Sequence, residues 1–479
     1  MPQTAVWGGF APAVTMWWTM MTQQPVCYWP TTSLICKDPT ALPDYRFFGI
    51  RTDYCQATGM CSTHADPVQV EGCEPILFFM FKRHGARYPE ENDPKHFEKI
   101  LPKLRDAIVE AHKKGKTTLC KWIIESLKLW KYNYKKEEEG HLSPAGVVTS
   151  GLIGRRYQQR FPSLLPRCFS NETYLLEYTT RIRTQQTAEA FMNAIIDNKA
   201  NERITDWGKP NNELVQFHQD CTARLKNFTS YKKAPVSQQK VFLNTSDVRL
   251  FLQIIRSRLG VNLTFDEIKI MVKYCSFETS MGRATPFCAL FKSEDFKIFE
   301  FYEDINDYYK DAYALPRNYQ QTCPMVKELT ERLNASANYF KCKNRTTKPP
   351  PKAVLYFSHA GGFKKLVARL GLFKDFRDIN GNDYCYLKEN REWRSSFVNP
   401  FSANLAFVLF KCRDDKFYVL SYLHEKPVIV RGCFSYFCPL PLFLQIPAAW
   451  QAKYNCDMEK ICVPTDTELG RTTRKPRRE

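Results

Sequence analysis

The sequence predicts an α/β protein in which a mixed sheet flanked by helices carries an inserted, mainly helical cap. Three short apolar runs have the length of buried strands, and each is followed by a polar or glycine-rich break and then by residues that start a helix. They are 76–81, 174–178 and 353–357. Long segments rich in helix formers lie between these units and indicate that the cap is inserted into the sheet domain.

Amphipathic helices follow the second and third of these strands. After 174–178, one helical face carries Ala188, Phe191, Met192, Ile195 and Ile196. After 353–357, the same spacing places Phe363, Leu366, Val367 and Leu370 on one face. We expect these faces to pack against the core. The helix starts then lie beside the strand ends, where α/β proteins form a crevice lined by backbone N–H groups that face anions.

The remaining segments complete the predicted organisation. Ser143 and Pro144 are a good N-cap and first-turn pair for a further helix, and 404–410 with 417–422 predict a hairpin. We expect an α/β core of residues 41–100, 140–200 and 350–465 and a helical cap of residues 101–139 and 201–349. We expect residues 1–40 to form an N-terminal segment and residues 466–479 to form a basic tail. The stretch 5–21 is apolar enough for the core of a signal region, although no Lys or Arg precedes it.

Composition and charge narrow the classes of partner. The chain has 479 residues, of which 44% are hydrophobic and 14% aromatic, so long disorder is not expected. Its net charge of +19 favours anionic partners, because unbalanced positive charge attracts anions over a long range. We expect no nucleic-acid binding, since the sequence lacks any recognisable module for it. We also expect no transmembrane span after position 40, where no long uncharged apolar stretch occurs.

Cysteines and glycosylation motifs indicate the secretory pathway, with the protein either secreted or retained in the lumen of the endoplasmic reticulum. The 18 cysteines lack the paired spacing of structural zinc sites, so we expect disulfides, one of them at Cys73. Six N-glycosylation motifs agree with this route. They lie at Asn171, Asn227, Asn244, Asn262, Asn334 and Asn344.

The most specific motif directly follows the 76–81 strand. It consists of Arg83, His84, Gly85, Ala86, Arg87, Tyr88 and Pro89. Two guanidinium groups can hold a phosphate through bidentate, charge-assisted hydrogen bonds, while the neutral imidazole of His84 attacks phosphorus to form a phosphohistidine. Gly85 removes the side chain where the backbone must pass close to the phosphate. The motif therefore predicts a phosphate site with His84 as the nucleophile.

This RHGxRxP pattern resembles the signature of the histidine phosphatase branch that contains acid phosphatases and phytases. The resemblance extends from about Tyr45 to about Pro447 and is greatest to the multiple inositol polyphosphate phosphatases. It rests on further blocks at 48–54 (FGIRTDY), 140–165, 286–313, 399–412 and 423–428 (LHEKPV). It implies a histidine-phosphatase-like fold, hydrolysis of phosphomonoesters, and inositol polyphosphates such as phytate as substrates. It implies neither a metal nor another cofactor.

The resemblance also assigns roles to individual residues. Arg83, His84 and Arg87 match the motif, and Arg183 matches a later phosphate-binding arginine, eight residues before Phe191. Arg181 is the alternative for that position. His359 matches the second histidine of the family, whose implied role is to bind the phosphate and to stabilise the charge that develops as the bond to the leaving oxygen breaks.

The chain departs from the family pattern directly after His359. Acid phosphatases have Asp next, and the inositol polyphosphate enzymes have Ala-Glu, where the carboxyl group protonates the leaving alkoxide. This chain has Ala360 and then Gly361. A positioned acid is typically worth about 10² to 10⁴ in rate, so turnover is expected to be weakened unless another group acts. By sequence, Glu90 and Glu91 are the nearest alternative proton donors.

Two interpretations of the function follow. The first is a phosphatase of inositol polyphosphates that acts through a phosphohistidine, and the second is a catalytically impaired protein that binds the same ligands. Four lysines of the cap can either contact the phosphates that do not react or form a solvated helix face. They are Lys113, Lys114, Lys116 and Lys121.

Overall fold

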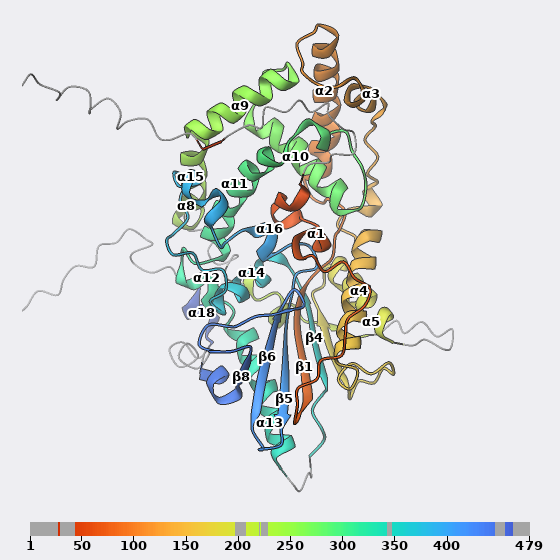
Figure 1. Cartoon of the computed structure of the whole chain (residues 1–479), viewed down its shortest axis with the longest axis vertical. Coiled ribbons are helices and arrows are strands. Elements are labelled where there is room, and N and C mark those ends of the chain that lie inside the picture. The colour runs from red at the N-terminus through yellow and green to blue at the C-terminus, as the bar shows by residue number, and fades with distance from the viewer. Residues whose placement is uncertain are drawn as a thin grey trace, which may run out of the picture.

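The sheet and the cap occupy opposite ends of the long axis of the molecule (Figure 1). The computed structural model describes residues 27–28, 44–196, 207–219, 221, 229–342, 347–445 and 456–462. The predicted N-terminal segment, except for residues 27–28, and the predicted basic tail lie outside these residues. The predicted fold class, a mixed sheet flanked by helices with a mainly helical cap, is confirmed.

Within the described residues the sheet has eight strands in the order β3-β2-β4-β1-β5-β6-β7, and β8 pairs with β6. The central strand β1 (Cys73–Arg83) runs parallel to β4 (Ala353–Ser358) and antiparallel to β5 (Asn404–Cys412). β2 (Tyr174–Tyr178) pairs in parallel with β4, and β5 forms a hairpin with β6 (Phe417–Leu423). Short strands complete the edges: β3 (Lys209–Pro210), β7 (Lys426–Pro427) and β8 (Phe437–Pro439). The three strands and the hairpin expected from the sequence are therefore present.

Strand β1 is continuously apolar from Ile76 to Phe81 because both faces of this part of the strand are covered. Phe78 and Met80 point into one core and Phe79 and Phe81 into another, as the alternation of side chains along a strand requires. The first core includes α4 (Pro144–Arg160) and α5 (Ile182–Ile195). The second core includes α13 (Cys323–Lys341) and α14 (Ala360–Arg369). The end of β1 is thus fixed from both sides.

The helices beside the sheet begin where the sequence predicts. The Ser143 side chain accepts a hydrogen bond from the backbone N–H of Gly146, which caps α4 at its N-terminus. The predicted apolar faces of α5 and α14 are buried in the two cores. Helix α13 lies along the sheet (Figure 1), although it falls within the range 201–349 that the sequence assigns to the cap. The division into core and cap ranges stays a prediction.

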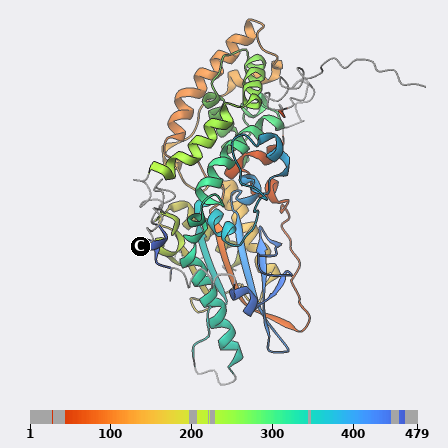
Figure 2. The same cartoon turned by 90° about the vertical axis from the view of Figure 1, so that its left-hand side faces the viewer.

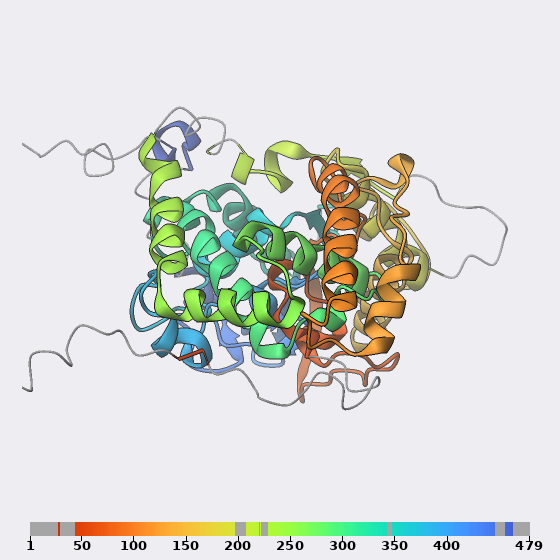
Figure 3. The ribbon, with the colours of Figure 1, turned by 90° about the horizontal axis from the view of Figure 1, so that it is seen from above.

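The cap is a helical layer built mainly on aromatic and aliphatic packing. Its main helices are α2 (Asp93–Lys113), α3 (Lys121–Leu129), α8 (Thr229–Leu243), α9 (Ser246–Leu259), α10 (Phe265–Ser280) and α11 (Ser293–Asp311). Figure 2 shows α2 and α9 at the end farthest from the strands, and Figure 3 shows them from above, in orange and yellow-green. The shorter helices are η2 (Tyr45–Phe47), η3 (Gly49–Arg51), α1 (Tyr54–Thr58), η4 (Lys136–Glu138), α6 (Asn212–Val215), η5 (Cys288–Leu290), α12 (Pro316–Gln320), α15 (Tyr384–Asn390), α16 (Ser395–Val398) and α18 (Met458–Ile461).

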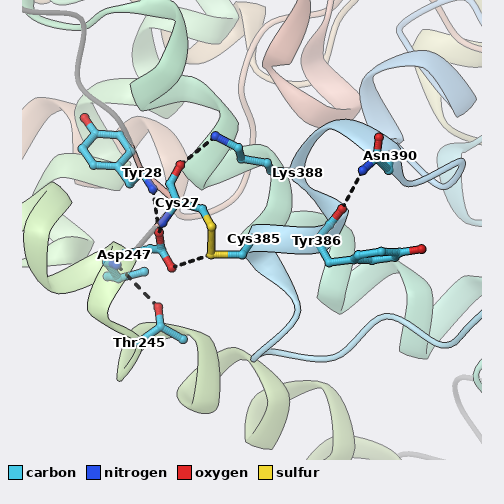
Figure 4. The surroundings of a disulfide bond; sticks show 9 residues. Cys27, Tyr28, Thr245, Asp247, Cys385, Tyr386, Lys388 and Asn390 are labelled. Carbon is cyan, nitrogen blue, oxygen red and sulfur yellow. Dashed lines mark hydrogen bonds between the residues drawn. A yellow bond between two sulfur atoms is a disulfide. The ribbon is translucent and has the colours of Figure 1, made fainter. Parts of the chain in front are cut away.

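Disulfides connect distant parts of the chain, as the cysteine content predicts. Seven pairs lie within the described ranges: Cys27–Cys385, Cys55–Cys61, Cys73–Cys412, Cys221–Cys462, Cys275–Cys288, Cys323–Cys456 and Cys433–Cys438. Figure 4 shows the first of these, where the carboxylate of Asp247 accepts a hydrogen bond of 2.6 Å from the backbone of Cys27. Cys73, expected to be paired, joins β1 to β5.

The surface features expected of a secretory protein are consistent with the structure. Four of the six motif asparagines are exposed: Asn171, Asn244, Asn262 and Asn334. Asn227 and Asn344 lie outside the described residues. No helix in the part of the chain that the structure describes combines the length and the apolar character needed to span a bilayer.

Candidate active site

His84 lies at the carboxyl end of β1, where the strand passes into the motif loop. Its backbone is held on both sides, since its N–H donates to Ser358 at 3.0 Å and its carbonyl accepts from Ser402 at 3.0 Å. Nδ1 lies 2.9 Å from the Gly85 carbonyl, which can only accept, so Nδ1 carries the proton and Nε2 keeps its lone pair. Burial, reinforced by Arg183 and Arg83, holds the pKa of His84 well below its usual value. The imidazole is therefore neutral and suited to nucleophilic attack.

Gly85 is required by a close approach between the motif loop and α4. A Cβ atom at this position would lie 2.8 Å from the carbonyl oxygen of Gly146 and 3.0 Å from Ser150 Oγ. The backbone N–H of Gly85 donates to Thr187 Oγ1 at 3.1 Å, which ties the loop to α5 as well. The glycine of the motif thus lets the loop lie directly against the helix that supports it.

Arg83 is fixed beside His84 by the backbone of two other segments. Its Nη1 donates to the carbonyl oxygens of Ile50 at 2.6 Å and Asn399 at 2.7 Å. Its guanidinium lies 4.6 Å from the centre of the Phe401 ring. These contacts explain why the blocks at 48–54 and 399–412 accompany the motif, because each supplies one of the two carbonyl oxygens.

Arg87 and Arg183 converge on one carboxylate. Glu90 lies 3.1 Å from Arg87 Nη2 and 3.0 Å from Arg183 Nη1, so it bridges the two guanidinium groups. Burial, and then the like charge of Arg87, lowers the pKa of Arg183 to about 10. Such proximity of like charges is expected where a multiply charged anion binds. Arg181, the alternative to Arg183, is exposed, whereas Arg183 donates to Glu90.

His359 directly follows β4 and stands at the N-cap of α14. Its ring centre lies 5.6 Å from that of His84, and its Nε2 forms a hydrogen bond of 2.9 Å with Thr179 Oγ1. Burial and the nearby Arg183 hold the pKa of His359 well below its usual value. The two histidines that the sequence singled out, 275 positions apart, are thus brought together by the parallel pairing of β1 and β4.

A third histidine, His218, packs against Gly361 and Gly362, directly after His359. A Cβ atom on Gly361 would lie 2.9 Å from His218 Cδ2, and one on Gly362 would lie 3.1 Å from His218 Nδ1. The ring centres of His218 and His359 are 6.3 Å apart. Burial, and then the charge of Lys365, lowers the pKa of His218 to about 4. No sequence pattern points to this residue, because His218 belongs to no motif and follows the short helix α6.

The other candidates from the sequence are placed less favourably. Glu90 contacts Arg87 and Arg183, the two arginines expected to bind phosphate. Glu91 is exposed and has a left-handed backbone φ of 64°. The four cap lysines, Lys113, Lys114, Lys116 and Lys121, are exposed. Lys113 is the last residue of the 21-residue helix α2, about 30 Å along the helix axis from its start near the motif. Of the two interpretations, a solvated helix face therefore fits these lysines better than contact with the substrate phosphates.

The geometry defines a class of protein. A neutral histidine with a free Nε2 lone pair stands among Arg83, Arg87 and Arg183, with a second histidine on the adjacent parallel strand. This arrangement suits transfer of a phosphoryl group to nitrogen, since cations neutralise the oxygens of phosphate while the imidazole attacks phosphorus.

Comparisons with known proteins agree with that class. The family model for the histidine phosphatase superfamily (branch 2) matches residues 79–424, and the chain belongs to this family. The chain is 26% identical to multiple inositol polyphosphate phosphatase 1 of Drosophila melanogaster over 382 residues, covering 76% of this chain and 77% of that protein. It is 25% identical to the Homo sapiens protein of the same name over 417 residues, covering 81% and 83%.

Solved structures show the same fold. The phytase from D. castellii superposes with a TM-score of 0.64 at 18% identity, covering 85% of each chain. The Bifidobacterium longum multiple inositol polyphosphate phosphatase in complex with inositol hexasulfate superposes with a TM-score of 0.62 at 16% identity, covering 84% of this chain and 98% of that one. The resemblance stated from the motif is thus confirmed at the level of family and fold.

Proposed function

We propose that this protein hydrolyses phosphomonoesters of inositol polyphosphates, with phytate-type compounds as substrates and a phosphohistidine on His84 as the intermediate. The observation that carries the proposal is the tautomer of His84, whose Nδ1–H is held by the Gly85 carbonyl while Nε2 keeps its lone pair among three arginines. The relatives named above act on inositol polyphosphates according to their names, and the net charge of +19 favours such anions.

Each residue of the site has a separate role in the proposed reaction. Arg83, Arg87 and Arg183 bind the oxygens of the reacting phosphate, and Glu90 gives up its place between two of them when the anion enters. Nε2 of His84 attacks phosphorus as the bond to the substrate oxygen breaks. His359 donates a hydrogen bond to the phosphate and stabilises the charge that develops there. Water then attacks the phosphohistidine, releases phosphate and restores the neutral imidazole.

The test combines turnover with trapping of the intermediate. His84→Ala should abolish phosphate release from phytate and leave the far-UV circular dichroism spectrum unchanged, because the loop is held by backbone hydrogen bonds and not by the imidazole. A phosphate-labelled substrate, quenched in alkaline denaturant during turnover, should label the wild-type protein and not the variant. Equal activity of both proteins would refute the proposal.

A second candidate function rests on Gly361, which lacks the carboxyl group of the family pattern. A protein with intact arginines and no proton donor would bind inositol polyphosphates without turnover. Phosphate release from phytate between pH 3 and pH 8, measured beside binding of the same ligand by calorimetry, separates the two functions. Binding without release or labelling would favour this second function.

We also propose that the protein belongs to the secretory pathway, either secreted or luminal in the endoplasmic reticulum. The disulfides and the four exposed glycosylation motifs support this location. Digestion with an N-glycosidase should lower the apparent mass of protein made in animal cells, and an unchanged mass would count against the proposal.

A further inference from the structure

His218 fills the space that the missing acid would use. Gly361 lies in the first turn of α14, two residues after His359, and its φ lies outside the left-handed region. The backbone would therefore accept a side chain, but a Cβ atom there would press against His218 Cδ2 at 2.9 Å. The same ring faces Gly362, so two adjacent glycines form the surface on which the imidazole packs. The position that lacks the carboxyl group of the family pattern, Gly361, is therefore also the position against which His218 packs.

The chemistry of the leaving group calls for an acid at this place. An inositol phosphate leaves as an alkoxide, which is strongly basic, so the transition state gains from a proton supplied to the bridging oxygen. The ring centre of His359 lies 6.3 Å from that of His218 and 5.6 Å from that of His84. His359 thus lies near both the nucleophile and His218, so the three imidazoles belong to one cluster.

We propose that His218 is the proton donor to the leaving oxygen, in place of the carboxyl group that the family carries at position 361. This inference rests on the proposed phosphatase function. As the phosphorus–oxygen bond breaks, its electron pair stays on the substrate oxygen and the proton of the His218 imidazolium moves to that oxygen. The neutral imidazole then accepts a proton from the water that attacks the phosphohistidine, which returns His218 to its starting form.

The surroundings of His218 link its protonation to the bound substrate. Lys364 and Lys365 of α14 approach from one side, and both are paired with Asp311 of α11. Lys364 also contacts Asp307 at 2.7 Å, and His359 faces the ring from the end of β4. Burial, and then the charge of Lys365, favours the neutral ring. A phosphate dianion beside the ring favours the imidazolium, so the acid form is enriched when substrate binds.

Asp307 is the competing donor among the described residues. Its carboxylate is buried, and the charge of Asp307 acts on Arg83, so it lies on the side of the phosphate site. However, it forms an ion pair with the Lys364 ammonium group, which is itself buried. The Lys364 ammonium group opposes protonation of this carboxylate, although burial favours it. Asp307→Asn therefore serves as the comparison variant.

The experiment compares leaving groups. His218→Gln should lower kcat for phytate by about 10²-fold, whereas kcat for p-nitrophenyl phosphate should fall by less than about 5-fold, because nitrophenolate leaves without a proton. His64→Gln, a histidine whose side chain is 71% exposed, is the matched control and should change neither rate. In the wild-type protein, kcat for phytate should decrease as pH rises through the pKa of His218 in the complex, and this decrease should be absent for the aryl ester.

A second set of variants distinguishes proton donation by His218 from a purely structural role of this residue. Gly361→Glu alone should gain nothing, because the new side chain meets the His218 ring, whereas Gly361→Glu combined with His218→Ala should recover at least about 10-fold of the phytate rate lost in His218→Ala. A recovery of this kind requires an acid and would not follow from packing. Equal losses on both substrates in His218→Gln, or a selective loss on phytate in Asp307→Asn with none in His218→Gln, would overturn the inference.

The experiments separate the role of His218 from the phosphatase function itself. If His84 is labelled during turnover and the aryl ester is hydrolysed, but His218→Gln releases phosphate from phytate at the wild-type rate, only the role of His218 is refuted. If wild-type protein shows no labelling and hydrolyses neither substrate, the phosphatase function itself is refuted, and the inference is refuted with it.

Discussion

A single methyl group at Gly85 should damage both the stability and the activity of this protein. In Gly85→Ala the new Cβ atom would lie 2.8 Å from the Gly146 carbonyl oxygen and 3.0 Å from Leu142 Cδ1. Ordinary contacts begin at 3.4 Å, so the motif loop and α4 must separate by about 0.6 Å at the backbone contact. Backbone cannot yield as a flexible side chain does, and overpacking of this kind costs about 1 to 3 kcal/mol.

The same displacement acts on catalysis because Gly85 is bonded to His84. A shift approaching 1 Å in a reacting group can reduce the rate by about 10²-fold, so we expect kcat for p-nitrophenyl phosphate to fall by about 10-fold or more. Urea denaturation gives the free energy of unfolding, and initial rates under saturating substrate give kcat. The aryl ester is used because its rate depends on the nucleophile rather than on protonation of the leaving group.

Gly151→Ala is the matched control on the neighbouring helix. There the nearest atoms to a new Cβ are Ala194 Cβ at 3.3 Å and Ala190 O at 3.4 Å, so little must move. An alanine also favours the helix by up to about 1 kcal/mol relative to glycine. We expect unchanged kcat and equal or higher stability. Wild-type stability and activity in Gly85→Ala would refute the steric reasoning and imply that the loop has room at its contact with α4.

Three further predictions concern buried charge, pH and the thiols. Glu425→Gln should lower the free energy of unfolding in urea by about 3 to 5 kcal/mol, because Arg156, bound to Glu425 at 2.6 Å, would stay buried without its counter-charge. Burial lowers the pKa of His424 to about 4, so the folded state resists the proton that the unfolded chain binds below its pKa of about 6.5. Stability should therefore decrease from pH 6.5 to pH 4, by about 3 kcal/mol from this residue, and His424→Gln should make the measured pH dependence shallower by that amount. Alkylation of the native, non-reduced protein followed by peptide mass mapping should modify the exposed thiols of Cys168 and Cys342, and modification of most cysteines would contradict the disulfides.

The two histidines proposed to act in catalysis could be located from the sequence because their signals are local. The strand at 76–81 is apolar throughout, the RHGxRxP motif follows it directly, and His359 directly follows the Ala353–Ser358 strand. Strand length, helical periodicity and motif spacing each depend on residues that are neighbours in the chain. The fold class, the family and the use of cysteines in disulfides follow from such patterns and from composition, and the structure and comparisons confirm them.

Only the tertiary structure decided how the site is completed. The carboxylate of Glu90, which the sequence suggested as an alternative proton donor, bridges Arg87 and Arg183. His218 comes to lie against Gly361 although no pattern connects the two positions. A contact between segments far apart in the chain leaves no periodicity and no fixed spacing, since it depends on how the sheet and cap pack. The sequence by itself determined that an acid is missing at position 361, and only the packing of the folded chain determined which side chain fills its place.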